Sequence, residues 1–111
     1  MKVRTHHYTY EVVFAPKGSP EWEDAPDGVQ STDSGYADHD HETIVIREDL
    51  APSMKADTLL HEMLHIAALA GGATEGAKLK EEGWVSIAAA GLKQMLVCDN
   101  DEVFEYLGVN L

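Results

Sequence analysis

Alternation of hydrophobic and polar residues predicts two β-strands in the first half of the chain. Between residues 8 and 15 every second side chain is large and hydrophobic, namely Tyr8, Tyr10, Val12 and Phe14. This period of two is typical of a strand with one buried face. The stretch Thr43–Arg47 is hydrophobic on both faces at its centre, as expected for a strand covered on at least one side.

A long helix is predicted from about Met54 to Ala70, directly after the second strand. Ser53 is the expected N-cap, and the pair Gly71-Gly72 is a strong stop signal. Hydrophobic residues surround nearly all of the helix axis, so we expect this helix to be buried in the middle of a small domain. The polar residues on such a helix therefore need an explanation.

Two further helices are predicted in the last third of the chain. A periodic hydrophobic segment runs from about Leu79 to Val97, although the internal residues Gly83 and Gly91 weaken the helical pattern. Asp99 or Asn100 is the expected cap of a short final helix. Together these elements predict an α+β fold, in which a small antiparallel or mixed sheet packs on a central helix and a second long helix.

Length and composition fit one folded domain that covers residues 1–111. The chain has 44% hydrophobic residues, which is ordinary for a globular protein. The first residues lack the hydrophobic run of a signal peptide, and no segment is long enough to span a bilayer. We therefore expect a cytoplasmic protein.

The charge is strongly negative, and this argues against two classes of partner. Twenty Asp and Glu residues against eight Lys and Arg residues give a net charge of -12. Such a chain repels nucleic acid and anionic membrane surfaces. The stretch from Gly18 to Ile46 contains no Lys or Arg, and we expect turns and at most one short strand in it. Its acidic loop, residues 18–42, is expected to be solvated, and the alternative is a docking surface for a basic partner.

The predicted central helix carries the sequence His61-Glu62-Met63-Leu64-His65. With steps of about 100° per residue, His65 lies about 40° and Glu62 about 100° from His61. Two imidazoles one turn apart can bind one Zn²⁺ ion, and catalytic zinc sites use three protein ligands and a water. Glu62 is rotated away from the ligands and is expected to act as the general base toward the zinc-activated water. The ordinary alternative is a pair of core histidines that form hydrogen bonds with their neighbours.

A third ligand has to come from a later segment, and Glu81 and Glu82 open the next predicted helix. Glu82 shares its side of that helix with Val85 and Ala89, which would direct its carboxylate toward the core and the metal. We therefore prefer Glu82 and keep Glu81 as the alternative. Either residue could instead be a solvated acid that stabilises the N-terminus of the helix.

A second group of potential ligands, Asp38-His39-Asp40-His41-Glu42, lies upstream of the helix. If this segment is extended, its two histidines share one face. In an acidic loop rich in glycine such residues are usually solvated, so we do not expect a metal ion there. His41 or Asp40 is nevertheless expected near the zinc, and Tyr36 and His41 are candidates for stabilising an oxyanion. His6 and His7 are expected before the first strand, facing solvent.

The stretch from Thr58 to His65, followed by Glu81-Glu82 and by Ala89–Leu92, resembles small phage-encoded proteins of the minimal zincin type. These are similar to the ImmA/IrrE and SprT-like metallopeptidases. The resemblance includes Gly35–Asp38 and the turn at Asp99-Asn100. It implies a gluzincin-like peptidase. In such peptidases a Glu that is followed three residues later by a small hydrophobic residue is a metal ligand, and Glu82 matches this pattern. The chain departs from the phage-encoded proteins at two positions. These proteins commonly have proline where this chain has Ala90 and an acidic residue where it has Gly83.

The function expected from these features is hydrolysis of peptide bonds in a peptide or protein substrate. The resemblance implies that the strand Thr43–Arg47 binds an extended peptide along its free edge. The alternative is a non-catalytic virion-associated or interaction protein that keeps the zincin scaffold and binds a virion or host protein. The sequence does not indicate an oligomeric state.

Overall fold

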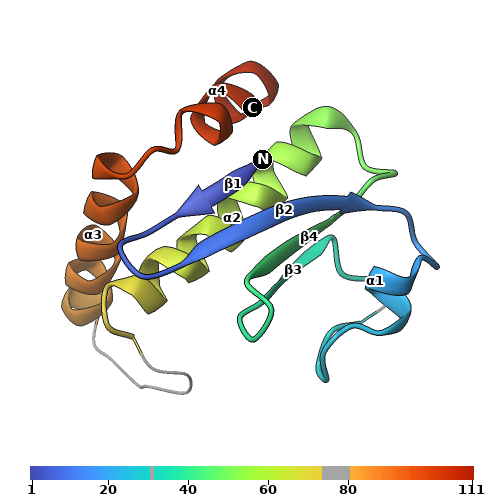
Figure 1. The fold of residues 1–111 in the computed structure, drawn as a ribbon, viewed down its shortest axis with the longest axis horizontal. Helices are drawn as coiled ribbons and strands as arrows, with labels where there is room; N and C mark the ends of the chain where they lie inside the picture. Colours follow the sequence, from blue (N-terminus) through green and yellow to red (C-terminus); the bar gives the residue numbers. More distant parts are fainter. Residues whose placement is uncertain (31, 74–80) are drawn as a thin grey trace.

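The computed structural model describes residues 1–30, 32–73 and 81–111, without the side chains of residues 81 and 82. The strands are β1 (Lys2–Arg4), β2 (Thr9–Ala15), β3 (Gly35–Asp38) and β4 (Thr43–Arg47). The helices are α1 (Pro20–Glu23), α2 (Pro52–Ala70), α3 (Glu81–Val97) and α4 (Asp101–Asn110) (Figure 1). The predicted α+β class with a mixed sheet is confirmed.

The four strands form one sheet in the order β1-β2-β4-β3. Strands β2 and β4 are parallel, with Val12 opposite Ile44, and the pairs β1–β2 and β3–β4 are antiparallel. Because β4 has a hydrogen-bonded neighbour on each side, the expectation of a free edge on Thr43–Arg47 is wrong. The free edge on this side of the sheet belongs to β3. Strand β1 was not predicted, since three residues are too few to show a period, and His6 and His7 therefore follow the first strand.

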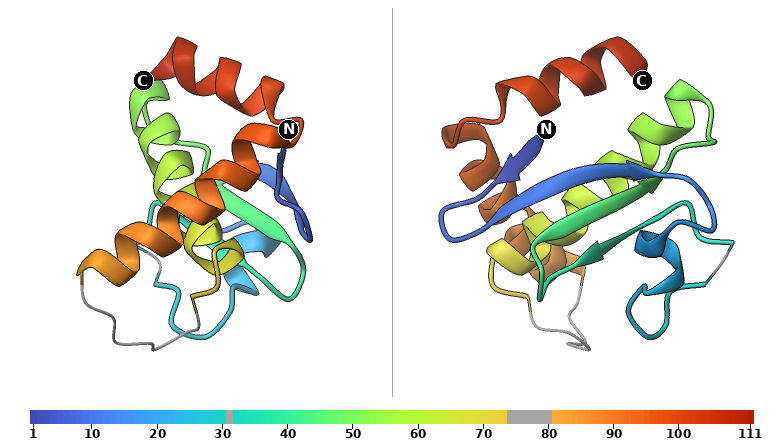
Figure 2. Two further views of the ribbon diagram at one scale, coloured as in Figure 1. Left: turned by 90° about the vertical axis from the view of Figure 1, so that its left-hand side faces the viewer. Right: turned by 45° about the vertical axis from the view of Figure 1, so that its right-hand side comes forward.

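The sheet separates two hydrophobic clusters. The larger one lies between the sheet and α2, with contributions from α3 and α4, and includes Tyr10, Ile44 and Leu59. The smaller one lies on the opposite face, where Trp22 of α1 packs against Tyr36. Figure 2 shows the three long helices on one face and α1 on the other. This explains why β4 is hydrophobic on both faces, because its residues contribute to both clusters.

Helix α2 begins one residue before the expected N-cap and is less enclosed than predicted. Pro52 occupies its first turn and Ala51 its N-cap position, so the prediction of Ser53 as the cap is wrong. The helix ends at Ala70, as predicted. Leu64 is 46% exposed, and the two motif histidines are exposed as well. One stripe of α2 thus faces solvent, and only the remaining sides are covered by the sheet, α3 and α4.

Helix α3 continues through Gly91 because this glycine lies at its crossing with α2. A Cβ atom at Gly91 would overlap the carbonyl oxygen of Ala67, and one at Gly71 would overlap that of Ile87. The two backbones therefore touch, and the contact is possible because of Gly71 and of Gly91, one of the two glycines that weakened the sequence pattern. The Nε2 atom of Gln94 also donates to the carbonyl oxygen of Ala70 at 2.9 Å. Residue 79, where we expected the helix to begin, lies outside the described residues.

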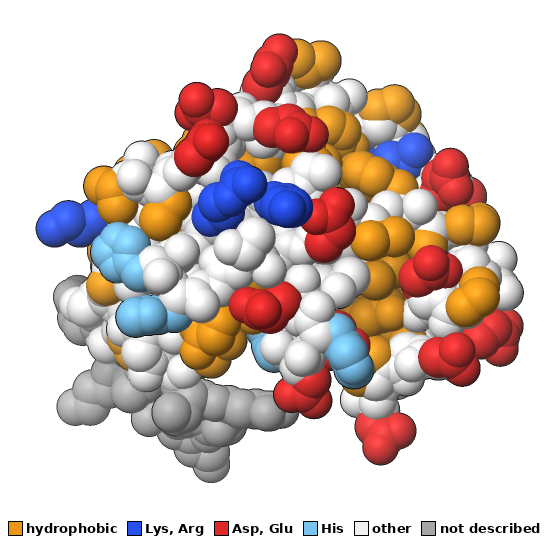
Figure 3. Space-filling view, in the orientation of Figure 1, with side chains coloured by type: hydrophobic (Ala, Val, Ile, Leu, Met, Phe, Trp, Pro, Cys, Tyr) orange, Lys and Arg blue, Asp and Glu red, His pale blue; other side chains and the backbone are white. Residues whose placement is uncertain are grey.

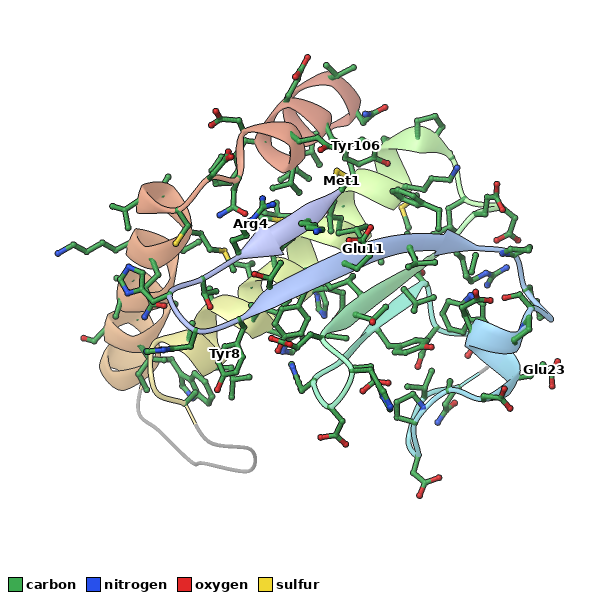
Figure 4. The ribbon with its side chains drawn as sticks, viewed as in Figure 1. Met1, Arg4, Tyr8, Glu11, Glu23 and Tyr106 are labelled. Atoms are coloured by element: carbon green, nitrogen blue, oxygen red, sulfur yellow. The ribbon has the colours of Figure 1, made fainter. Side chains whose placement is uncertain are left out.

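The link between α3 and α4 is fastened to β1 by Asn100. Asn100 occupies the N-cap position of α4, as one of the two predicted caps, but its side chain does not bond to that helix. Its Nδ2 atom donates to the carbonyl oxygens of Arg4 at 2.9 Å and Met95 at 2.8 Å, and its Oδ1 atom accepts from the amide of Arg4 at 2.7 Å. Arg4 lies beside this link in Figure 4.

Acidic side chains are spread over the face shown in Figure 3, and Lys and Arg side chains are few there. This distribution agrees with the net charge of -12. In the part of the chain that the structure describes, no helix has the length and hydrophobicity needed to cross a bilayer.

Candidate metal centre

His61 and His65 lie one turn apart on the exposed stripe of α2, with their rings next to each other. The two Nε2 atoms are 3.2 Å apart, and the ring centroids are 4.8 Å apart. Two zinc–nitrogen bonds of about 2.0–2.1 Å at a tetrahedral angle place the nitrogens about 3.3–3.4 Å apart. The observed spacing therefore fits two ligands of one zinc ion. The spacing of the motif predicted this juxtaposition, and the structure confirms it.

The same spacing also fits a hydrogen bond, in which one protonated Nε2 donates to the other. Both histidines are exposed, so burial does not require that they bind anything. The expectation that a fully covered helix forces the histidines to find a partner is wrong for this reason. The case for a metal rests on the geometry of the nitrogens and on their neighbours.

The side chain of Glu62 lies in a different environment from the side chains of the two histidines. Its side chain is buried, at 8% exposure, and it lines a cavity together with His65. Burial raises the pKa of Glu62, and the nearby imidazoles of His65, His61 and His39 oppose this effect. Among the described residues its carboxylate forms no hydrogen bond or ion pair. The group is therefore free to accept a proton from a molecule in the cavity.

The cavity has a volume of about 680 Å³ and lies between β3 and the second half of α2. Strand β3 contributes one wall, from Gly35 to Ala37, and His39 extends that wall. The opposite side is hydrophobic and includes Leu69 of α2 and Trp84 of α3. A cavity of this size, with hydrophobic walls and a few polar groups at one end, is typical of a binding site for a small molecule or a peptide side chain.

The predicted third ligands, Glu82 and Glu81, have side chains that lie outside the described residues. The backbone of α3 nevertheless removes the reason for preferring Glu82. Val85 and Ala89, which were expected to face the core, are both exposed, and the side of α3 that contacts α2 is that of Ile87 and Gly91. The choice between the two acids therefore stays open. Among the described side chains, no three His, Cys, Asp or Glu are grouped to hold a metal ion.

Asp38 ends β3, and the four residues that follow it, 39–42, form a turn and not an extended strand. The Oδ1 atom of Asp38 accepts the amides of Asp40 at 3.1 Å and His41 at 3.2 Å. Its Oδ2 atom lies 2.9 Å from Nδ1 of His41, the side chain of which is 79% exposed. The expectation that the two histidines share one face is wrong, because the turn directs His41 outward and His39 to the cavity.

His39 is the site residue that the sequence reasoning missed. The lining of the cavity includes His39 and neither Asp40 nor His41, although one or the other of these was expected near the zinc. One signal in the sequence was available, since Asp before a polar run commonly accepts the amides of a tight turn. A turn predicts that neighbouring side chains diverge, but it does not predict which one reaches α2.

Tyr36 is not placed to stabilise an oxyanion in the cavity. Its hydroxyl donates to the carbonyl oxygen of Glu21 on the opposite face of the sheet. Its ring packs edge to face against Trp22, at a centroid distance of 5.2 Å. Tyr36 therefore fastens α1 to the sheet, and the expectation of a catalytic role for its hydroxyl is wrong.

Comparison with known proteins gives no relative from which a role could be transferred. No protein-family model matches the chain, and searches of curated proteins and of solved structures found no significant match.

Proposed function

We propose that this protein is a zinc-dependent peptidase, in which α2 supplies two ligands and the general base. One observation carries the proposal. The Nε2 atoms of His61 and His65 are 3.2 Å apart, and the buried carboxylate of Glu62 lies beside them at the wall of a cavity. A pair of histidines without a function does not need a buried acid next to it.

The proposed ligands are His61, His65 and either Glu82 or Glu81, with the fourth position open. When bound, zinc would polarise the scissile carbonyl and increase the acidity of a water molecule. Glu62 takes the proton from that water and later gives it to the leaving amine. Burial raises the pKa of Glu62, which makes its carboxylate a stronger base than an exposed one.

The substrate is proposed to bind as an extended peptide along β3. Among the described residues this strand pairs with β4 on one side only, and its residues form one wall of the cavity that Glu62 and His65 line. Unpaired amide and carbonyl groups of an edge strand bind a peptide by strand addition. The hydrophobic wall at Leu69 and Trp84 favours a substrate with a hydrophobic side chain next to the scissile bond.

The decisive experiment compares the wild-type protein with Glu62→Gln, which keeps the shape of the side chain and removes the base. Zinc binding is measured by calorimetry, and hydrolysis is measured by mass spectrometry on a pool of synthetic peptides. We expect unchanged zinc affinity and a loss of hydrolysis of at least about 100-fold. Glu105→Gln, at an exposed position of α4, is the matched control and is expected to behave like the wild type. Equal hydrolysis by Glu62→Gln and wild type would refute the proposal.

A second candidate function, a non-catalytic virion-associated or interaction protein, is favoured by the outer face of α3. Val85, Leu92 and Leu96 are exposed at spacings of seven and four residues, and Leu96 is 73% exposed. An exposed hydrophobic stripe with helical spacing is typical of a surface that binds another protein. If this function is correct, Leu96→Glu abolishes partner binding and Glu62→Gln leaves partner binding unchanged. If the protein is a peptidase, Glu62→Gln abolishes hydrolysis and Leu96→Glu leaves hydrolysis unchanged.

A further inference from the structure

His39 lies in the wall of the cavity, and a buried tyrosine holds its ring in place. The hydroxyl of Tyr10 lies 2.8 Å from Nδ1 of His39, and the two rings pack edge to face with centroids 5.8 Å apart. Tyr10 is 1% exposed and belongs to the core between the sheet and α2. His39 itself is exposed on the cavity side. Nδ1 of the imidazole is thus held by a core residue, the ring lines the cavity, and Nε2 has no hydrogen-bond partner among the described residues.

The hydrogen bond to Tyr10 determines which ring nitrogen of His39 carries the proton. Burial, with added effects of Glu42, Tyr8 and Asp38, raises the pKa of Tyr10 to about 12, so its hydroxyl keeps its proton at neutral pH. In the described part of the chain, Nδ1 of His39 is the only acceptor within reach of this hydroxyl. A buried hydroxyl donates where an acceptor is present. The neutral imidazole therefore accepts at Nδ1 and carries its hydrogen on Nε2.

The cavity consequently contains one neutral donor close to its acidic group. Both His39 and Glu62 line this cavity. A peptide carbonyl oxygen is an acceptor that gains negative charge when water attacks its carbon. A donor with a fixed orientation, held by a core residue, suits that oxygen better than a mobile surface group does.

We propose that His39 is a substrate-binding residue that donates its Nε2 hydrogen to a carbonyl oxygen of the bound peptide, and that Tyr10 positions it. This inference rests on the proposed peptidase function and names a group that binds the substrate independently of the metal ligands. His41 does not share the role, because it bonds to Asp38 on the outside of the turn.

The first test does not depend on activity. In the metal-free protein, long-range ¹H–¹⁵N NMR of the imidazoles at about pH 8 reports the tautomer of each neutral histidine. We expect the wild-type His39 ring in a single Nε2–H form and the Tyr10→Phe ring in a mixture of tautomers. His39→Gln identifies the signal by its disappearance. A wild-type ring protonated at Nδ1 would overturn the inference, whatever the activity of the protein.

The second test measures zinc affinity and hydrolysis of the peptide pool for His39→Ala, His39→Gln and the control His41→Ala. For His39→Ala we expect unchanged zinc affinity and a decrease in kcat/KM of at least about 100-fold, the effect of removing one donor to an oxyanion. Gln can still donate from its amide, so His39→Gln should retain more activity than His39→Ala. His41→Ala should match the wild type.

The outcomes separate this inference from the proposed function. If Glu62→Gln abolishes hydrolysis while His39→Ala changes it by less than about threefold, His39 has no such role and the peptidase proposal stands. If His39→Ala loses zinc affinity as His65→Ala does, His39 is a ligand and the inference is wrong. If the wild-type protein hydrolyses no peptide, both proposals fail, and the tautomer experiment still reports whether Tyr10 positions His39.

Discussion

Two pairs of histidines each contribute one member to the cavity wall, His65 and His39, and the protein holds the two pairs by different means. His61 and His65 are four residues apart on α2, and the helix alone brings their Nε2 atoms to 3.2 Å. His39 and His41 are two residues apart in a turn, and the turn sends them to opposite sides. The first arrangement depends on a regular backbone, whereas the second depends on a few side-chain hydrogen bonds.

The two pairs should therefore respond differently to substitutions elsewhere in the molecule. The position of α2 against the rest of the molecule depends on its close contact with α3, so distant substitutions can move the first pair as a unit relative to the cavity wall. The turn is held by Asp38 at the end of β3 and by Tyr10 of β2, so only substitutions in the turn or at these two residues should disturb the second pair. The four predictions below test this contrast, from the largest expected effect to the smallest.

Gly91→Ala should cause the largest loss of stability, because its Cβ would overlap the carbonyl oxygen of Ala67, which belongs to a rigid helix. Forcing extra atoms into a closely packed contact costs about 3 kcal/mol or more where the backbone cannot move. We expect the melting temperature, measured by circular dichroism, to fall by more than about 10 °C. Gly108→Ala is the control, since a Cβ there meets nothing within 4 Å and alanine favours a helix. Equal melting temperatures for the two variants would contradict the backbone contact.

His65→Ala should weaken zinc binding by more than about 100-fold. Loss of a residue that only forms a hydrogen bond to a metal ligand weakens binding by up to about 100-fold, and loss of a ligand should weaken it more. The matched control is His41→Ala, which removes an exposed histidine from the turn. Calorimetric titration with zinc measures both variants. A similar loss of affinity in the two variants would show that the histidine pair on α2 has no special role in binding.

Glu81→Gln and Glu82→Gln should differ from each other, because the proposed site needs one carboxylate from the beginning of α3. We expect one of the two variants to lose zinc affinity by about 10-fold to 100-fold and the other to bind as the wild type does. The same titration assigns the third ligand. Unchanged affinity in the double variant would exclude both acids as ligands.

Asp38→Asn should have the smallest effect, confined to the turn. Partial burial would raise the pKa of Asp38, but hydrogen bonds from His41 and Asp40 outweigh this and hold the pKa below its ordinary value of 3.8. A lowered pKa in the folded state stabilises the protein above pH 3.8, and this contribution disappears as the pH falls through the folded-state pKa. We expect the variant to be less stable by at most about 1 kcal/mol at neutral pH, with a smaller difference in acid. Urea unfolding at the two pH values measures this, and a difference that grows in acid would contradict it.

Several parts of the fold could be predicted because local patterns determine them. Strand β4 and the end of α2 were predicted at their observed residues, and the alternation of residues 8–15 predicted β2 to within one residue. The short elements β1 and α1 were not predicted, since three or four residues carry no readable period. Burial was predicted less well than secondary structure, because hydrophobic residues around a whole helix do not show which side another element will cover.

The sequence by itself determined that His61 and His65 would lie together, because the geometry of an α-helix places residues four apart on the same side. It also determined the acidic charge and the position of Glu62 beside the two histidines. Only the tertiary structure decided that Glu62 is buried while the histidines are exposed, that β3 and not β4 is the free edge, and that His39 reaches the cavity. These features depend on contacts between residues far apart in the chain, which no local period encodes.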